Sequence, residues 1–146
     1  MGVFRAYDIR GVFGEDLTPE LALKIGMAFG SFLEGKLEVV VGWDSRLTSP
    51  ILRDCVMAGL ASTGCDCLDV GLIPTPVLYF SSIHYGEKAG VMVTASHNPP
   101  QYNGFKLCKG GISYSYETGI SLVENFVKSQ NFRLVEWDKT GKLGYK

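Results

Sequence analysis

Apolar residues recur along the chain at two spacings, one typical of helices and one typical of buried strands. Helical spacing, with start signals at Thr18-Pro19 and Ser49-Pro50, predicts helices over residues 18–35, 49–64, 75–84 and 116–128. Short apolar runs predict strands at residues 39–41, 67–70, 91–93 and 105–108. Strands and helices in alternation predict a layered α/β fold with a largely parallel sheet.

The aromatic side chains of these predicted helices favour a core role over a role as sugar-binding platforms. This interpretation covers Phe29, Phe32, Phe80 and Phe126. The apolar pattern dissolves after Val135, and the last residues are polar and contain glycine. We therefore expect one domain over residues 1–136 and a linker over residues 137–146.

Composition and charge narrow the function classes. The chain has 146 residues, of which 46% are hydrophobic and 20% charged, as in a globular domain with a real core. A net charge of −1 favours neither a nucleic-acid partner nor a membrane surface. The sequence shows no apolar run long enough for a bilayer and no secretory signal layout at its start, so we expect a soluble cytoplasmic protein.

The cysteines do not follow a metal-binding pattern. Cys65-Asp66-Cys67 lacks the two-residue spacing of a zinc knuckle, and Cys55 stands among apolar helix residues. We interpret all four cysteines, Cys55, Cys65, Cys67 and Cys108, as buried or incidental thiols without chemistry.

One polar loop is a candidate for chemistry. The predicted strand at residues 91–93 ends directly in Thr94-Ala95-Ser96-His97-Asn98-Pro99-Pro100. In open α/β sheets, ligands bind beyond the carboxyl ends of the strands. Asn103-Gly104 predicts a tight reversal that leads back to a strand with Lys106. A phosphoryl group on Ser96 could be held by Lys106, Arg10 and a metal.

The residues alone leave other interpretations of this loop open. Ser, His, Asn and Pro are ordinary loop formers, and Ser96 and His97 could simply bond to the backbone. A serine hydrolase is a second alternative, although the sequence has no Gly-x-Ser-x-Gly elbow. It has no Gly-x-x-x-x-Gly-Lys phosphate loop either. The spacing of the residues by itself therefore predicts only an α/β domain with an unusual polar loop.

Five segments in order resemble the α-D-phosphohexomutases, the family of phosphomannomutase and phosphoglucomutase. The loop Thr94-Ala95-Ser96-His97-Asn98-Pro99 resembles the phosphoserine loop of that family. The other four segments are Phe4-Arg5-Ala6-Tyr7-Asp8-Ile9-Arg10-Gly11, Gly42-Trp43-Asp44-Ser45-Arg46, Gly71-Leu72-Ile73-Pro74-Thr75-Pro76 and Tyr102-Asn103-Gly104-Phe105-Lys106. The first and last of these look more like the phosphomannomutase/phosphoglucomutase branch than the phosphoglucosamine branch.

The resemblance implies a three-layer α/β/α domain I with a mixed, mostly parallel sheet, and it implies a mechanism. Phosphoserine at Ser96 would give its phosphoryl group to a hexose phosphate and regain one from a 1,6-bisphosphate intermediate. The implied cofactor is Mg²⁺, bound through the phosphate on Ser96, and the implied activator is glucose 1,6-bisphosphate or mannose 1,6-bisphosphate.

Roles for individual residues follow from the same resemblance. His97 and Lys106 would line the reacting phosphate, and Arg10, with Tyr7 nearby, would lie at the floor of the cleft. Asn98 and Asn103 would bind substrate or support the loop. The other residues of these segments have structural roles in our interpretation. Asp44 and Arg46 form a brace, and Pro74-Thr75-Pro76 forms a rigid turn between strand and helix.

The chain departs from the complete family pattern in its length. Complete members have four domains, and the Asp-x-Asp-x-Asp metal loop of the second does not occur in this sequence. The implied partners are therefore a hexose phosphate and the remaining domains of the same polypeptide. We expect the isolated chain to fold without appreciable mutase activity. The alternative is a stand-alone module that binds phosphosugars without turnover.

Overall fold

The computed structural model describes residues 2–35, 37–86 and 88–146, which form a sheet between helices. The strands are β1 (Ile9–Val12), β2 (Val39–Trp43), β3 (Cys67–Leu72), β4 (Ala89–Val93), β5 (Tyr102–Lys109), β6 (Ile112–Ser113) and β7 (Leu143–Tyr145). The helices are α1 (Pro19–Phe32), α2 (Ser49–Ser62), α3 (Thr75–His84) and α4 (Ser121–Ser129). A π-helical turn (Tyr116–Ile120) leads into α4, and a 3-10 turn (Trp137–Lys139) precedes β7.

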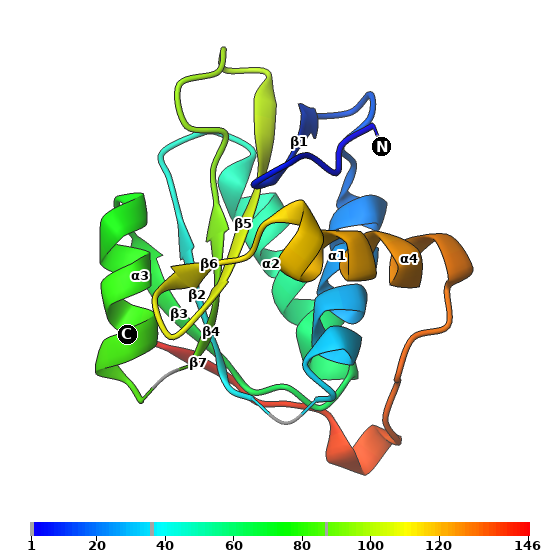
Figure 1. Cartoon of the computed structure of the whole chain (residues 1–146). Helices are drawn as coiled ribbons and strands as arrows, with labels where there is room; N and C mark the ends of the chain where they lie inside the picture. The colour runs from blue at the N-terminus through cyan, green and yellow to red at the C-terminus, as the bar shows by residue number, and fades with distance from the viewer. Residues whose placement is uncertain (1, 36, 87) are drawn as a thin grey trace.

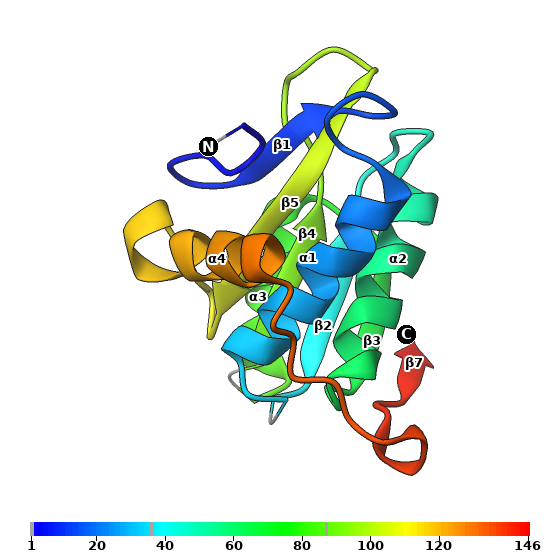
Figure 2. The same cartoon turned by 90° about the vertical axis from the view of Figure 1, so that its right-hand side faces the viewer.

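The sheet is mixed, with strand order β1-β5-β4-β2-β3-β7 and β6 beside β5. Strands β4, β2, β3 and β7 run parallel, whereas β5 is antiparallel to β4, β1 and β6. Helices α1, α2 and α4 cover one face and α3 covers the other (Figures 1 and 2). The predicted three-layer α/β/α architecture with a mixed, mostly parallel sheet is confirmed.

The main core lies under α1 and α2, which approach each other through glycines. A Cβ on Gly59 would meet the carbonyl oxygen of Leu23, the Met27 amide nitrogen at 2.7 Å and the Gly26 Cα at 2.9 Å. A Cβ on Gly26 would in turn meet the Val56 carbonyl oxygen. The two helix backbones are therefore in contact, and this position of α2 fixes where the loop before it emerges beside the sheet.

The N-terminal strand β1 was not predicted, because its sequence Ile-Arg-Gly-Val is too short and too polar for an apolar run. Its buried and half-buried positions alternate, as in a strand that packs on one face only. Ile9 pairs with Phe105 and Arg10 with Gly104 of β5. β1 thereby brings the segment that contains Arg10 next to Lys106.

The predicted reversal at Asn103-Gly104 is wrong, because both residues lie inside β5. The reversal occurs earlier, where the Asn98 amide bonds to Ala95 and the Tyr102 amide bonds to Pro99. A Cβ on Gly104 would meet the carbonyl oxygen of Ile9, so glycine allows β1 and β5 to pair here rather than a turn to form.

Two further expectations need correction. Phe80 is not a core residue, since it is 63% exposed, whereas Phe29 is buried and Phe32 and Phe126 pack partly buried against the core. Residues 143–145 were expected in a linker, but they add strand β7 to the sheet beside β3. Their sequence, Leu-Gly-Tyr, carries too little apolar alternation to predict an edge strand. The domain boundary after residue 136 stays a prediction.

Candidate active site

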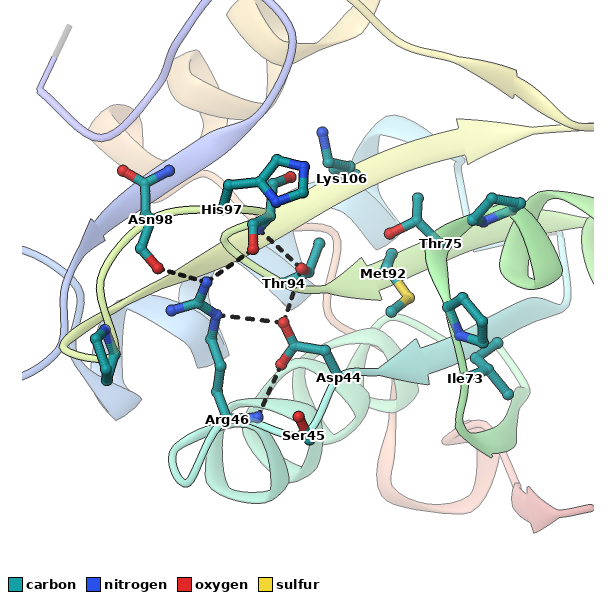
Figure 3. A pocket seen from close by; sticks show the side chains of 14 residues that line it. Asp44, Ser45, Arg46, Ile73, Thr75, Met92, Thr94, His97, Asn98 and Lys106 are labelled. Carbon is teal, nitrogen blue, oxygen red and sulfur yellow. Dashed lines mark hydrogen bonds and ion pairs between the residues drawn. The ribbon is translucent and has the colours of Figure 1, made fainter.

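A cleft of about 740 Å³ opens at the carboxyl ends of the parallel strands (Figure 3). Three loops line it, one after each of β2, β3 and β4, together with residues of β4 and β5. Parallel neighbours end at the same edge of a sheet, so loops far apart in sequence meet there. The lining residues are Asp44, Ser45, Arg46, Ile73, Pro74, Thr75, Pro76, Met92, Thr94, Ser96, His97, Asn98, Pro100 and Lys106.

Arg46 organises the loop after β4 from a position on the loop after β2. Its Nη1 donates to the carbonyl oxygens of Pro99 at 2.7 Å and Tyr102 at 3.2 Å. Its Nη2 donates to the carbonyl oxygens of Ser96 at 2.9 Å and Asn98 at 2.8 Å. One guanidinium thus holds four main-chain carbonyls of the Ser96 loop.

Asp44 links this arginine to the start of the same loop. Its Oδ2 accepts hydrogen bonds from Arg46 Nε at 3.3 Å and Thr94 Oγ1 at 2.8 Å. Its Oδ1 accepts from the Arg46 amide at 3.2 Å and from Ser49 Oγ at 2.6 Å. The predicted brace between Asp44 and Arg46 is therefore present. It does more than fix a local turn, because both residues also bond to the loop after β4.

Ser96 is exposed, and its backbone lies in the left-handed region with φ of 56°. A non-glycine residue in this region costs about 1 kcal/mol or more and persists only where its surroundings hold it. The Ser96 amide donates to Thr94 Oγ1 at 3.0 Å, and its carbonyl accepts from Arg46. Both peptide groups of Ser96 are fixed, and this exposed residue lines the cleft.

His97 and Lys106 complete the polar part of the cleft. Figure 3 shows the His97 ring and the Lys106 ammonium group on the same side, away from Ile73. Lys106 reaches the cleft from β5, where it pairs with Met92 of β4. Between Ser96 and His97 no side-chain hydrogen bond is found within the described part of the chain, so the geometry does not favour a serine hydrolase.

A buried carboxylate connects the two predicted cations behind the cleft. Asp8, with only 4% of its surface exposed, accepts two bonds from Arg10 Nη2, at 2.9 and 3.2 Å. Its Oδ2 also lies 3.9 Å from Lys106 Nζ. Asp8 had no predicted role, because it directly precedes β1 and its contact with Lys106 arises only from the pairing of β1 with β5.

Of the remaining predicted residues, Arg10, Asn103 and Tyr7 lie outside the cleft lining, whereas Asn98 belongs to it. Asn103 is buried in β5, where its amide group donates to Thr48 Oγ1 at 2.9 Å and Ser49 Oγ at 3.0 Å. Tyr7 lines a separate hollow of about 360 Å³ with residues 6 and 115–117. Asn98 is in the cleft, and its side chain donates to the Ala95 carbonyl at 2.9 Å. The structure thus brings together Ser96, His97, Lys106 and Asn98, but not the whole predicted set.

The segment Pro74-Thr75-Pro76, predicted as a turn between strand and helix, is instead the N-cap and first two residues of α3, and it forms one wall of the cleft. Because α3 starts at Thr75, the positive end of its helix dipole faces this space. Together with Lys106 and His97, the wall gives the cleft a potential that favours an anionic ligand.

The described residues contain no ready-made metal site, and the pKa values of the four cysteine thiols are raised. In residues 2–35, 37–86 and 88–146, no group of three or more His, Cys, Asp or Glu side chains is placed to hold a metal ion. Burial raises the pKa of the Cys108 thiol to about 11, and it also raises the pKa values of Cys55, Cys65 and Cys67. Thiols of this kind carry little thiolate at neutral pH and are poor nucleophiles.

Residues 1–133 match the family described as "Phosphoglucomutase/phosphomannomutase, alpha/beta/alpha domain I". The chain belongs to this family. The membership rests on most of the chain, including all five segments that carried the resemblance.

Relatives of this phosphoglucomutase/phosphomannomutase domain are named as different sugar-phosphate mutases. The chain is 43% identical to a phosphoglucomutase/phosphomannomutase of Thermococcus kodakarensis over 97% of this chain and 32% of that protein. It is 48% identical to a probable phosphoglucosamine mutase of Pyrococcus horikoshii over 96% and 31%, respectively. A phosphomannomutase of Escherichia coli is 43% identical over 95% and 31%. The chain therefore spans about a third of these relatives, and the choice between the branches stays a prediction.

Solved structures give the same result for the fold. A phosphoglucomutase/phosphomannomutase family protein from Burkholderia thailandensis superimposes with a TM-score of 0.82 at 38% identity, over 99% of this chain and 32% of that one. A putative phosphomannomutase from Thermus thermophilus gives a TM-score of 0.83 at 28% identity, over 100% and 33%. None of the described helices is long and apolar enough to cross a bilayer.

Proposed function

We propose that this chain is the phosphoserine-bearing domain of a phosphohexomutase and that Ser96 carries the phosphoryl group. The supporting observation is the position of Ser96, an exposed hydroxyl on a loop held from both sides at the edge of an anion-favouring cleft. Such a fixed loop suits phosphoryl transfer, in which the protein contributes mainly position and charge.

The proposed reaction is an exchange of one phosphoryl group between two oxygens. The bond from phosphorus to Ser96 Oγ breaks, and a bond from phosphorus to a hydroxyl oxygen of the hexose phosphate forms. The sugar hydroxyl loses its proton and Ser96 Oγ gains one, so neither water nor another reactant enters. In the second exchange the other phosphoryl group of the 1,6-bisphosphate moves to Ser96 Oγ, so that Ser96 is phosphorylated again. Glucose 1,6-bisphosphate or mannose 1,6-bisphosphate would load a dephosphorylated protein.

Charge and protons would be managed by Lys106 and His97, which line the cleft, and by Arg10 on strand β1. Lys106, whose ammonium is only partly offset by Asp8 at 3.9 Å, can neutralise a phosphoryl oxygen. His97, next to Ser96 on the loop, can hold or release the proton that the exchange moves. Arg10, fixed by Asp8, would hold phosphate beside Lys106 on the neighbouring strand.

Magnesium fits this chain only through the phosphoryl group. Asp44, the carboxylate that lines the cleft, accepts four hydrogen bonds from protein donors, so its oxygens are committed. A phosphate on Ser96 would supply one hard oxygen ligand, and the other ligands would come from outside this chain. When bound, Mg²⁺ would supply positive charge to the transferring phosphoryl group.

The isolated chain should fold but fail to interconvert hexose 1- and 6-phosphates, because it forms only one wall of the substrate site. A coupled assay with glucose 1-phosphate or mannose 1-phosphate checks this at high concentrations of the purified chain, against the complete protein that contains it. Circular dichroism and a cooperative melt verify that the chain is folded. Turnover by the isolated chain at a rate like that of the complete protein would contradict the proposal.

The source open reading frame separates the mutase from a stand-alone binding module. A mutase predicts that coding sequence continues beyond Lys146 into a segment with an Asp-x-Asp-x-Asp metal loop. A stop codon directly after Lys146, together with phosphosugar binding by the purified chain, would instead support a module without turnover.

A further inference from the structure

We propose that Arg46 is a positioning residue for phosphoryl transfer, which fixes the backbone of Ser96 and turns the loop carbonyls away from the phosphoryl group. The inference rests on the proposed function, because it assigns Arg46 to the transfer from Ser96. In this role Arg46 acts through the backbone of the Ser96 loop and does not bind phosphate itself.

Arg46 has no donor left for a ligand. A guanidinium carries five N–H groups, one on Nε and two on each terminal nitrogen. In this chain Nε donates to Asp44, Nη1 to Pro99 and Tyr102, and Nη2 to Ser96 and Asn98. The side chain is 12% exposed. Although Arg46 lines the cleft, its hydrogen-bonding capacity is directed entirely into the protein.

These contacts close a ring around the backbone of Ser96. The Ser96 amide donates to Thr94 Oγ1, and the Thr94 hydroxyl donates to Asp44 Oδ2. Asp44 pairs with Arg46 Nε, and Arg46 Nη2 returns to the Ser96 carbonyl. The ring holds the peptide groups on both sides of Ser96, which explains how a serine keeps a φ of 56° on an exposed loop.

The ring also has an electrostatic consequence for a phosphoserine. Carbonyl oxygens carry partial negative charge, and a phosphoryl group on Ser96 would bring close to two negative charges. Four carbonyls of this segment accept hydrogen bonds from the guanidinium of Arg46, and Figure 3 shows two of these contacts. Without the guanidinium these carbonyls would be free to turn and repel the phosphoryl group.

Lysine cannot replace this arrangement, since its ammonium group has three donors around one point and no planar fork. The test compares Arg46→Lys with wild type in the complete protein. We expect kcat to fall about 100-fold, as for a small displacement of a reacting group. KM should stay within about two-fold, because Arg46 makes no contact with substrate.

Arg53→Lys provides the matched control. Arg53 is also a largely buried arginine, paired with Asp54 and Asp69 and placed over the Trp43 ring, but it has no contact with the Ser96 loop. The same substitution there should leave kcat and KM within about two-fold of wild type. Melting temperatures of both variants show whether any difference in kcat reflects positioning rather than folding.

Hydrogen exchange on the 146-residue chain supplies a readout that needs no turnover. Arg46→Lys should speed exchange of the amides of Ser96, Asn98 and Tyr102, which are hydrogen-bonded within the loop, while the amides of β2 and α2 keep their protection. If Arg46→Lys fails to fold, Thr94→Val breaks the same ring at another point and should give the same loss of kcat.

The outcomes separate this inference from the proposed function. A fully active Ser96→Ala variant would overturn the proposed function and this inference with it. An inactive Ser96→Ala with a fully active Arg46→Lys would overturn only the positioning role. A raised KM at unchanged kcat would also overturn it, because it would show that Arg46 binds substrate.

Discussion

Ser96→Ala should reduce mutase activity of the complete protein by at least about 1,000-fold, as expected when the group that carries a covalent intermediate is removed. The side chain is exposed, so the substitution removes little packing, and the free energy of unfolding should change by less than about 0.5 kcal/mol. Initial rates with glucose 1-phosphate and glucose 1,6-bisphosphate measure the first effect, and urea unfolding of the 146-residue chain measures the second.

Ser129→Ala is the matched control for this experiment, because Ser129 is an exposed serine at the end of α4, outside the cleft lining. It should leave activity unchanged. Retention of activity by Ser96→Ala would show that another group carries the phosphoryl moiety.

Gly59→Val should destabilise the isolated chain by about 3 kcal/mol, at the upper end for overpacked cores. Any side chain at Gly59 would collide with the backbone of α1, where the carbonyl oxygen of Leu23 and the amide of Met27 leave no space. The two helices would have to separate. Chemical denaturation of wild type and variant, with the midpoint and slope compared, measures the change.

The neighbouring position gives the control. Ala58 is exposed on the outer side of the same helix, so Ala58→Val retains the contact between α1 and α2 and should lower stability by less than about 1 kcal/mol. Equal losses from the two substitutions would show that valine weakens α2 through helix propensity alone and that the close helix contact contributes nothing.

The helices and central strands could be predicted from the sequence because their signals are local. Thr18 caps α1 by accepting a bond from the Leu21 amide, and Pro19 follows it at the first helical position. The Val39-Val40-Val41 run is buried on both faces of the sheet, as an apolar strand between two helix layers must be.

The edges of the fold depend on distant partners and could not be predicted in this way. Asn103-Gly104 has the local sequence of a turn, yet hydroxyls at the start of α2 and the carbonyl of Ile9 keep it in a strand. Phe80 has helical core spacing, but among the described helices α3 alone covers its face of the sheet (Figure 1), and Phe80 stays exposed.

The candidate site likewise has a part that could be predicted from the sequence and a part that could not. Ser96, His97 and Lys106 could be placed near one another because they follow or flank a single strand. The hydrogen bonds from Arg46 to the carbonyls after β4 could not be predicted, since these partners lie 50 to 56 residues further along the chain. Asp8 was also missed, because its contact with Lys106 depends on the pairing of β1 with β5.

The central claim is that Ser96 carries the phosphoryl group, and a label-and-chase measurement tests it most directly. The complete protein is incubated with glucose 1,6-bisphosphate labelled at phosphorus, digested and mapped, before and after addition of unlabelled hexose phosphate. The account predicts label on the peptide that contains Ser96 and its loss to the sugar on the time scale of turnover. Label on another residue, or label on Ser96 that unlabelled hexose phosphate does not remove, would contradict it.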